Sequence, residues 1–124
     1  MRFAELLARS CFSFLDGASQ PDELVEQSCA LGQSAVALCD RDGLYGSVRM
    51  HVAGREHEHP VIVGAELTLE TDVVRPYDER PQPSLALLVE SQAGYRSLCR
   101  LLTASHHDHD KGEAGIEARE IAAD

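Results

Sequence analysis

The residues of this chain best suited to chemistry by type and spacing are its histidines, which gather in two short groups. One group is His57-Glu58-His59, and the other is His106-His107-Asp108-His109-Asp110. Imidazole and carboxylate groups are common metal ligands. The first group, however, follows a predicted helix C-terminus, where histidines bond free carbonyls and favour the helix dipole. Consecutive residues of the second group rarely converge on one ion, so it indicates at most adventitious binding of a metal such as nickel.

The four cysteines, Cys11, Cys29, Cys39 and Cys99, show no C-x-x-C spacing. This spacing argues against a zinc ribbon or a dithiol redox motif. Cys29 and Cys99 fall in apolar helical patterns and Cys39 ends a strand pattern, which predicts buried free thiols; Cys11 lies in a loop and is expected to be partly exposed. The sequence also contains no glycine-rich phosphate loop, Ser-His-Asp order or nucleophile elbow.

The charge of the chain argues against nucleic acid as a direct ligand. Eleven basic residues face 21 acidic ones, for a net charge of −10, whereas nucleic-acid binding depends on neutralising phosphates. Arg96 and Arg100 are best explained as a solvated helix face. No apolar run approaches the roughly 18 residues that a membrane span needs, and residues 1–8 are too short and acidic for a signal peptide. We therefore expect weak or no nucleic-acid binding, no membrane contact and a cytoplasmic location.

Apolar periodicity predicts the elements that must position any site. Buried strands are expected over residues 3–7, 34–39, 61–63 and 85–89, and helices over about 20–32, 44–56 and 93–104. Residues 66–74 are expected to continue as an extended or hairpin segment, and the proline-containing stretch 75–83 as a surface loop. Strands that alternate with helices imply an α/β fold with a mainly parallel sheet. One domain over residues 1–105 and a weakly ordered tail over 106–124 are predicted.

Finer features of the helices can also be predicted. Ser19 is expected to be the N-cap of the first helix, with Asp22 completing a capping box. The apolar side chains expected to share one helix face are Leu24, Val25, Cys29 and Leu31 in the first helix, Leu44, Val48, His51 and Val52 in the second, and Tyr95, Leu98, Leu101 and Leu102 in the third.

Three segments in order, residues 6–19, 37–46 and 63–67, resemble the opening of a known domain. With residues 94–102 and Lys111-Gly112-Glu113, the match is to the PHP (polymerase and histidinol phosphatase) domain at the N-terminus of bacterial C-family DNA polymerase III alpha subunits, especially their error-prone branch. The resemblance implies a distorted β/α barrel. Since a full barrel takes about 250 residues, we expect this chain to form part of one, a truncated PHP-like domain.

The resemblance also implies where a metal cluster would lie, because PHP phosphoesterases hold divalent metals such as zinc or manganese at the ends of barrel strands. Leu7 and Arg9 stand in place of the family's His-x-His pair, Arg41 in place of a further histidine, and Ser84 in place of another. The implied ligands that remain are Asp16, Asp40 and Glu66. These three offer only hard oxygens, which suit weak magnesium or calcium binding.

Two interpretations of the three carboxylates remain open. They form a residual metal site, or they do local structural work: Asp16-Gly17 as a tight turn, Asp40 as a helix N-cap, and Glu66 solvated at a strand end. In the second case, Arg9 and Arg41 are expected among the carboxylates as internal counter-ions.

The favoured functional hypothesis is a non-catalytic PHP-like module whose metal site is degenerate. It would have no catalytic residue and no cofactor, and would serve a structural or interaction role in DNA replication or repair, or be a gene remnant. A homodimer or a polymerase-type protein partner is expected. The alternative is a small metal-dependent phosphoesterase that uses Asp16, Asp40 and Glu66, with the histidines of residues 106–109 as further ligands.

Overall fold

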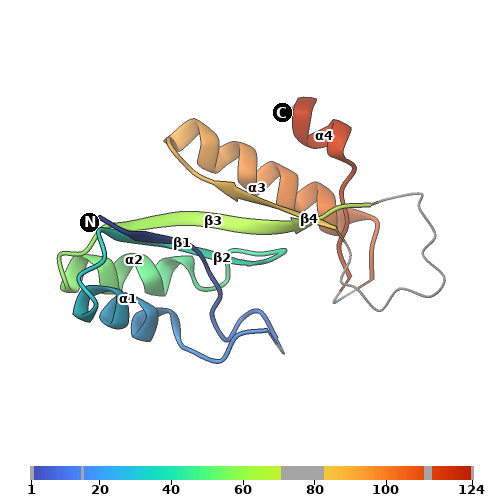
Figure 1. The fold of residues 1–124 in the computed structure, drawn as a ribbon. Helices are drawn as coiled ribbons and strands as arrows, with labels where there is room; N and C mark the ends of the chain where they lie inside the picture. Colours follow the sequence, from blue (N-terminus) through green and yellow to red (C-terminus); the bar gives the residue numbers. More distant parts are fainter. Residues whose placement is uncertain (1, 15, 71–82, 111–112, 124) are drawn as a thin grey trace.

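The computed structural model describes residues 2–14, 16–70, 83–110 and 113–123. Strands and helices alternate through most of the chain (Figure 1). The elements are β1 (Ala4–Ala8), α1 (Pro21–Ala30), β2 (Ala35–Arg41), α2 (Ser47–Glu56), β3 (Val61–Thr68), β4 (Ser84–Leu88), α3 (Gln92–His107) and α4 (Ala118–Ala123). The predicted α/β class and the order of its strands and helices are confirmed.

The four strands form one sheet in the order β1-β2-β3-β4. β1 pairs with β2, and β2 with β3, in parallel, as expected for β-α-β units. β4 is antiparallel to β3, with Thr68 opposite Ser84 and Gly64 opposite Leu88. β3 therefore runs five residues beyond the predicted strand and becomes one arm of a hairpin, as the expectation for residues 66–70 allowed. Residues 71–74 lie outside the described part of the chain.

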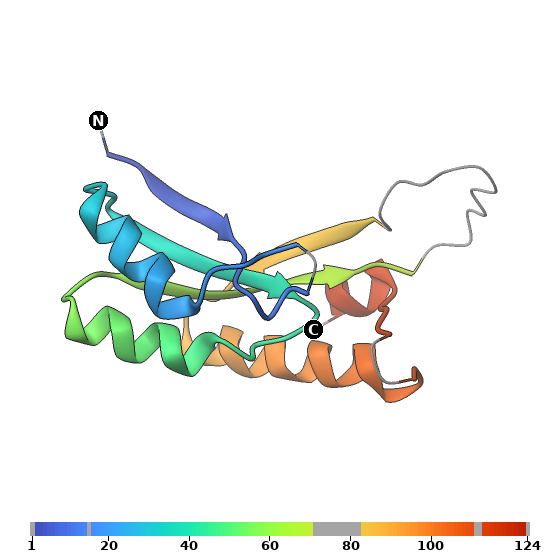
Figure 2. The same ribbon diagram turned by 90° about the horizontal axis from the view of Figure 1, so that it is seen from below.

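The sheet is curled, and its helices lie on the outside of the curl (Figures 1 and 2). The registers Val36 with Val61 and Asp40 with Ala65 place these side chains on one face, because neighbouring strands keep their pleats in step. That outer face carries both core clusters. Val36 and Leu38 pack with Val25, Met50 and Ala53 of α1 and α2, and Ala65 and Leu67 pack with Leu98, Leu101 and Leu102 of α3. The side chains that alternate with these along each strand lie on the inner face of the curl.

The buried faces of α1 and α2 differ in part from the predicted ones. α1 buries Pro21, Val25 and Ser28, and Leu24 packs against the same core cluster as Val25, so the prediction is confirmed for these two residues; Cys29 is exposed. α2 buries Met50, Ala53 and Gly54, and leaves Val48 at 75% and Val52 at 48% exposure. The two helices pack on each other as well as on the sheet, and Gly54 lets α2 approach the Val61 side chain of β3 closely, since a Cβ atom there would lie 2.8 Å from Val61 Cγ1. For α3 the prediction holds for Leu98, Leu101 and Leu102.

The predicted cap of α1 is one residue out of place. Gln20, not Ser19, is the N-cap, and Glu23 completes the capping box by accepting a hydrogen bond from the Gln20 amide at 3.2 Å. The spacing of the box was correct and its register was wrong, because a glutamine performs the role that the sequence pattern assigned to a serine.

Part of the segment beyond residue 105 is packed into the fold. Ile116 is 1% exposed and belongs to the α3 core cluster, and it forms a parallel bridge with Leu69. Its amide donates to the carbonyl of Thr68 at 3.1 Å. The division of the chain at residue 105 stays a prediction. Among the described residues, no helix has the length and hydropathy of a membrane span.

Candidate functional site

The inner face of the sheet carries charged side chains at the edge where β1, β2 and β3 end and β4 begins. Arg41 of β2 is opposite Glu66 of β3 in the parallel register, and Arg9 directly follows β1. Ser84, the first residue of β4, lies two positions before the partner of Glu66 and so on the same face. The carboxyl ends of parallel strands thus bring together residues that are up to 75 positions apart in the chain.

Two arginines and two carboxylates alternate at this edge; we call Arg9, Asp16, Arg41 and Glu66 the arginine–carboxylate cluster. Arg9 Nη2 donates to Glu66 Oε2, and Arg9 Nη1 lies 3.7 Å from Asp16 Oδ2. Arg41 Nη2 lies 3.7 Å from the same Asp16 oxygen. The 3.7 Å separations are too long for hydrogen bonds and represent ion pairs. Two of the three predicted carboxylates therefore lie beside the two arginines that were expected as counter-ions.

Glu66 is the most enclosed member of the arginine–carboxylate cluster, with its side chain 13% exposed. Ser84 Oγ donates to its second oxygen, Oε1, at 2.5 Å. Both carboxylate oxygens of Glu66 are therefore engaged by protein donors. The expectation that Glu66 is solvated at a strand end is wrong, because β3 continues to Thr68 and β4 pairs alongside it.

Asp40 lies apart from Asp16 and Glu66. It belongs to the outer-face set of β2, opposite Ala65, and its side chain is 1% exposed. It accepts hydrogen bonds from the Ser10 amide at 2.7 Å, Ser10 Oγ at 2.6 Å and Ser13 Oγ at 2.7 Å. The predicted N-cap role for Asp40 is wrong, since β2 runs to Arg41 and α2 begins six residues later with Gly46 as its N-cap. Asp40 instead holds the loop after β1 against the end of β2 through these hydrogen bonds.

That loop, residues 10–19, is closed by short backbone contacts. The amides of Asp16 and Gly17 donate to the Ser13 carbonyl at 3.0 and 2.9 Å, and the Cys11 amide donates to the Ser19 carbonyl at 2.8 Å. Asp16 and Gly17 thus close a turn that begins at Ser13, so the predicted turn lies earlier in the chain than Asp16-Gly17. A Cβ atom on Gly17 would lie 2.3 Å from the Ser10 carbonyl oxygen, so only glycine lets the two backbone segments approach this closely.

Sequence reasoning missed the structural roles of Ser10, Ser13 and Asp42. The Asp42 carboxylate accepts hydrogen bonds from the Thr68 amide at 2.8 Å and Thr68 Oγ1 at 2.7 Å, and its backbone adopts φ 52°. His106 Nε2 lies 2.7 Å from the Asp42 carbonyl oxygen. These pairs join segments 26 to 64 positions apart, so no local sequence pattern predicts these contacts.

The two histidine groups do not converge on one point. His59 Nε2 lies 2.8 Å from Ser28 Oγ, His106 contacts the Asp42 carbonyl, and His109 Nε2 lies 2.7 Å from Glu70 Oε1. His107 contacts its neighbour Asp108. Within the described ranges, no three histidine, cysteine, aspartate or glutamate side chains are grouped to hold a metal ion.

Cys39 lies two residues before Arg41 on β2, and so on the same face of the sheet, and is 1% exposed. Its Sγ donates to the Leu6 carbonyl oxygen at 3.3 Å. Burial raises the pKa of this thiol to about 11, and the nearby Glu66 and Asp40 carboxylates add to the shift. Cys39 is therefore a protonated, unreactive thiol at neutral pH. All four cysteines are free, and the predicted burial is correct for Cys39 and wrong for Cys29.

An open cleft of about 360 Å³ adjoins the arginine–carboxylate cluster. We call it the aromatic cleft, because Phe12, Phe14 and Tyr45 line it together with the charged side chains Asp16, Arg41, Asp42 and Glu113. Phe14 and Tyr45 are 82% and 66% exposed. Sequence reasoning did not single out these aromatic residues, which come from two loops that follow different strands.

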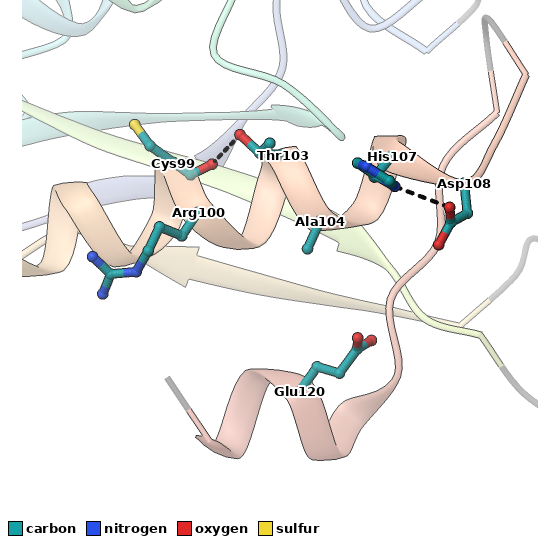
Figure 3. A pocket seen from close by; sticks show the side chains of 7 residues that line it. All are labelled: Cys99, Arg100, Thr103, Ala104, His107, Asp108 and Glu120. Atoms are coloured by element: carbon teal, nitrogen blue, oxygen red, sulfur yellow. Dashed lines mark hydrogen bonds and ion pairs between the residues drawn. The ribbon is translucent and has the colours of Figure 1, made fainter.

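A second hollow, of about 530 Å³, lies between α3 and α4. Figure 3 shows Ala104 on the side of α3 that faces α4, and Glu120 pointing back from α4. On the other side of α3, Thr103 Oγ1 donates to the Cys99 carbonyl at 2.9 Å. The side chains around this hollow are mixed in type and form no cluster with a recognisable chemistry.

The curled sheet, its outer helices and charged residues at the strand ends define a PHP-type fold, and the chain belongs to the PHP domain family: the model of the PHP domain matches residues 5–123. Among similar proteins, the error-prone DNA polymerase of Anaeromyxobacter sp. (strain K) is 49% identical over 105 residues, and that of Mycobacterium tuberculosis (strain ATCC 25618 / H37Rv) is 47% identical over 104 residues. These matches cover 85% and 84% of this chain. They cover 9% and 10% of the two polymerases, so the chain spans about a tenth of the length of these relatives.

The fold is also found in solved structures. A protein from Bifidobacterium adolescentis described as a metal-dependent phosphoesterase superposes with a TM-score of 0.62 at 24% identity. The match covers 84% of this chain and 33% of that one. At this level of identity the likeness concerns the fold, and what the site does must be argued from its own residues.

Proposed function

We propose that this chain is a non-catalytic PHP module, in which the arginine–carboxylate cluster takes the place of a metal cluster. Its role would be structural or one of interaction, in DNA replication or repair in the cytoplasm, beside a polymerase. The relationship to error-prone DNA polymerases supports this setting. The observation that carries the non-catalytic assignment is the contact between Arg9 and Glu66.

The donor set around Glu66 does not suit a divalent metal. A guanidinium group stays protonated at any physiological pH and cannot act as a ligand. Arg9 already occupies one oxygen of Glu66 and Ser84 Oγ the other. A metal ion would have to displace both donors and would then lie beside two fixed positive charges, Arg9 and Arg41. Neutral nitrogen ligands, which transition metals such as zinc prefer, are not gathered around Glu66 in the described part of the chain.

The alternative is a small metal-dependent phosphoesterase. It is favoured by the PHP family membership, by a fold neighbour described as a metal-dependent phosphoesterase, and by the survival of Asp16, Asp40 and Glu66 in the sequence. The separation of Asp40, which is buried on the outer face with three donors of its own, argues against its joining the other two.

The two functions are separated by metal content and activity. Protein purified without a nickel column should contain no stoichiometric zinc, manganese or iron by elemental analysis. It should not hydrolyse a chromogenic phosphoester when zinc, manganese or magnesium is added. The reason is one of ligand number, because the site offers two hard carboxylates and two cations where a metal cluster needs several neutral nitrogens.

A matched pair of variants sharpens this experiment. Glu66→Ala should leave the background rate unchanged, as should Glu26→Ala on α1, whose side chain is 57% exposed and lies 3.8 Å from His57 Nε2, outside the arginine–carboxylate cluster. About one equivalent of a transition metal, with hydrolysis abolished by Glu66→Ala and retained in Glu26→Ala, would establish the phosphoesterase instead.

A further inference from the structure

Aromatic side chains are scarce in this chain and gather at one place. The sequence holds three phenylalanines, three tyrosines and no tryptophan, and three of these six rings, Phe12, Phe14 and Tyr45, line the aromatic cleft. Phe14 is 82% exposed and Tyr45 66%. Aromatic rings gathered on an exposed surface are a common mark of a binding site, because leaving them in water is unfavourable.

The ring of Tyr45 is held in place although most of it is exposed. A Cβ atom on Gly43 would lie 2.3 Å from Tyr45 Cε2, so the ring rests against the backbone of the turn that precedes it. The Phe12 ring lies alongside, with the two centroids 6.5 Å apart and the planes tilted by 35°. The turn is itself fixed through the hydrogen bonds of Asp42 to Thr68. A ligand would therefore meet a preorganised ring and would lose little affinity in ordering it.

The charged side chains that line the cleft indicate the sign of the charge on its ligand. Asp16, Asp42 and Glu113 contribute three carboxylates to the lining, and Arg41 contributes one fixed cation. Arg41 is itself offset by its ion pair with Asp16. The whole chain carries a net charge of −10, so its field attracts cations and repels phosphates. Aromatic faces also attract cations through the ring quadrupole.

We propose that the aromatic cleft binds a cationic side chain, arginine or lysine, of a partner polypeptide. This inference rests on the interaction role proposed above and gives the partner a chemistry. The cation would lie against the exposed face of Tyr45, with Phe14 and the carboxylates of the lining around it. A planar guanidinium group fits this arrangement well, because it can stack on a ring while it donates hydrogen bonds to carboxylates.

The probe for the test is a fluorescein-labelled peptide of alternating glycine and arginine, and its neutral counterpart carries citrulline at each arginine position. Fluorescence anisotropy should show binding of the arginine peptide, weakened by salt, and no binding of the citrulline peptide. Tyr45→Leu, which keeps an apolar side chain but removes the ring, should weaken binding about three- to fivefold. Tyr45→Phe should retain the affinity of the native protein.

Tyr95→Leu is the matched control, since Tyr95 is an exposed tyrosine on α3, outside the cleft lining. It should leave binding unchanged, and circular dichroism should show all variants folded. An equal effect of Tyr45→Leu and Tyr95→Leu, no binding of the arginine peptide, or displacement of the peptide by micromolar mononucleotide would each overturn the proposal. Tyr45 lines the cleft but is not a member of the arginine–carboxylate cluster, and metal content and phosphoester hydrolysis are measured separately, so failure here is distinguishable from failure of the non-catalytic assignment.

Discussion

Asp40 is the side chain on which the loop after β1 depends. Asp40→Asn replaces one acceptor oxygen with an amide that would face donors from Ser10 and Ser13. Because these bonds are buried and go to a charged group, we expect the free energy of unfolding to fall by about 2–3 kcal/mol. Urea denaturation followed by circular dichroism measures the change.

The control is Asp108→Asn, since the Asp108 side chain is 88% exposed. It should alter stability by less than about 0.5 kcal/mol. A loss for Asp40→Asn no larger than that of the control would show that the loop does not rely on this carboxylate.

The Cys39 thiol makes stability depend on pH in the alkaline range. In the unfolded chain the thiol ionises near its ordinary pKa of 9.0, whereas in the fold its pKa is about 11. Between these values the folded state keeps a proton that the unfolded state has lost. The contribution of the protonated Cys39 thiol to the free energy of unfolding is therefore fully present below pH 9. It is lost as the pH rises through 11, by at most about 2–3 kcal/mol.

Urea midpoints at pH 8 and pH 10.5 measure this loss. Other side chains also change charge in alkaline solution, so the informative quantity is the difference from Cys39→Ala, in which the decline should be smaller. At pH 8.5, iodoacetamide should modify exposed Cys29 and leave Cys39 untouched. Rapid modification of Cys39 in the folded protein would contradict its raised pKa.

Single side chains divide into those whose position could be foreseen and those whose position could not. The resemblance to the PHP domain implied that Arg9, Arg41 and Glu66 stand at one site, and the structure groups them at the edge where the parallel strands end. Ser10 and Ser13 could not be assigned in this way. Their partner, Asp40, lies 27 to 30 residues away, and its orientation depends on whether β2 ends one residue earlier or later.

Strands and helices were easier to foresee than the faces they bury. The apolar runs identified β2 and β4 to within two residues at each end, because few other elements are compatible with such runs. The buried face of α2 was not predictable from hydropathy, because Gly54 lies against the Val61 side chain of β3 while Val48 and Val52 are exposed. Where a helix approaches a strand this closely, close packing favours a small residue over a larger apolar one.

At the level of elements, β1 and β4 are the two edge strands of the described sheet. Unpaired strand edges invite association, and Leu85 on β4 is 42% exposed. We propose that the protein forms a homodimer, or a stable complex with a polymerase-type partner, that buries apolar surface around residues 85–89. Light scattering of the purified chain should give a mass above that of the 13.5 kDa monomer.

Leu85→Lys should shift this mass toward the monomer, because a charge at the edge opposes pairing. Val48→Lys is the matched control, since Val48 is 75% exposed on α2 and lies away from either edge strand. A strictly monomeric, non-aggregating protein at high micromolar concentration would count against self-association.

For the molecule as a whole, the net charge of −10 sets the expected affinity for DNA. The chain should repel the phosphate backbone, and the carboxylates around the aromatic cleft reinforce that repulsion. Fluorescence anisotropy with a labelled single strand at physiological salt should therefore show no saturation in the low micromolar range. Submicromolar binding that weakens steeply with salt would reverse this expectation.

The close approach of Gly17 to the Ser10 carbonyl bears on how the sequence can vary over evolutionary time. Any side chain at position 17 would push the backbone at Ser10 away, and Ser10 carries two of the hydrogen bonds that reach Asp40. Substitutions ordinarily accumulate in surface loops. Here a side chain at position 17 would displace Ser10 and so disturb its hydrogen bonds to the buried Asp40 carboxylate. Position 17 should therefore be as intolerant of change in a mutational library as the interior of β2, while its neighbour Ala18, which is exposed, varies freely.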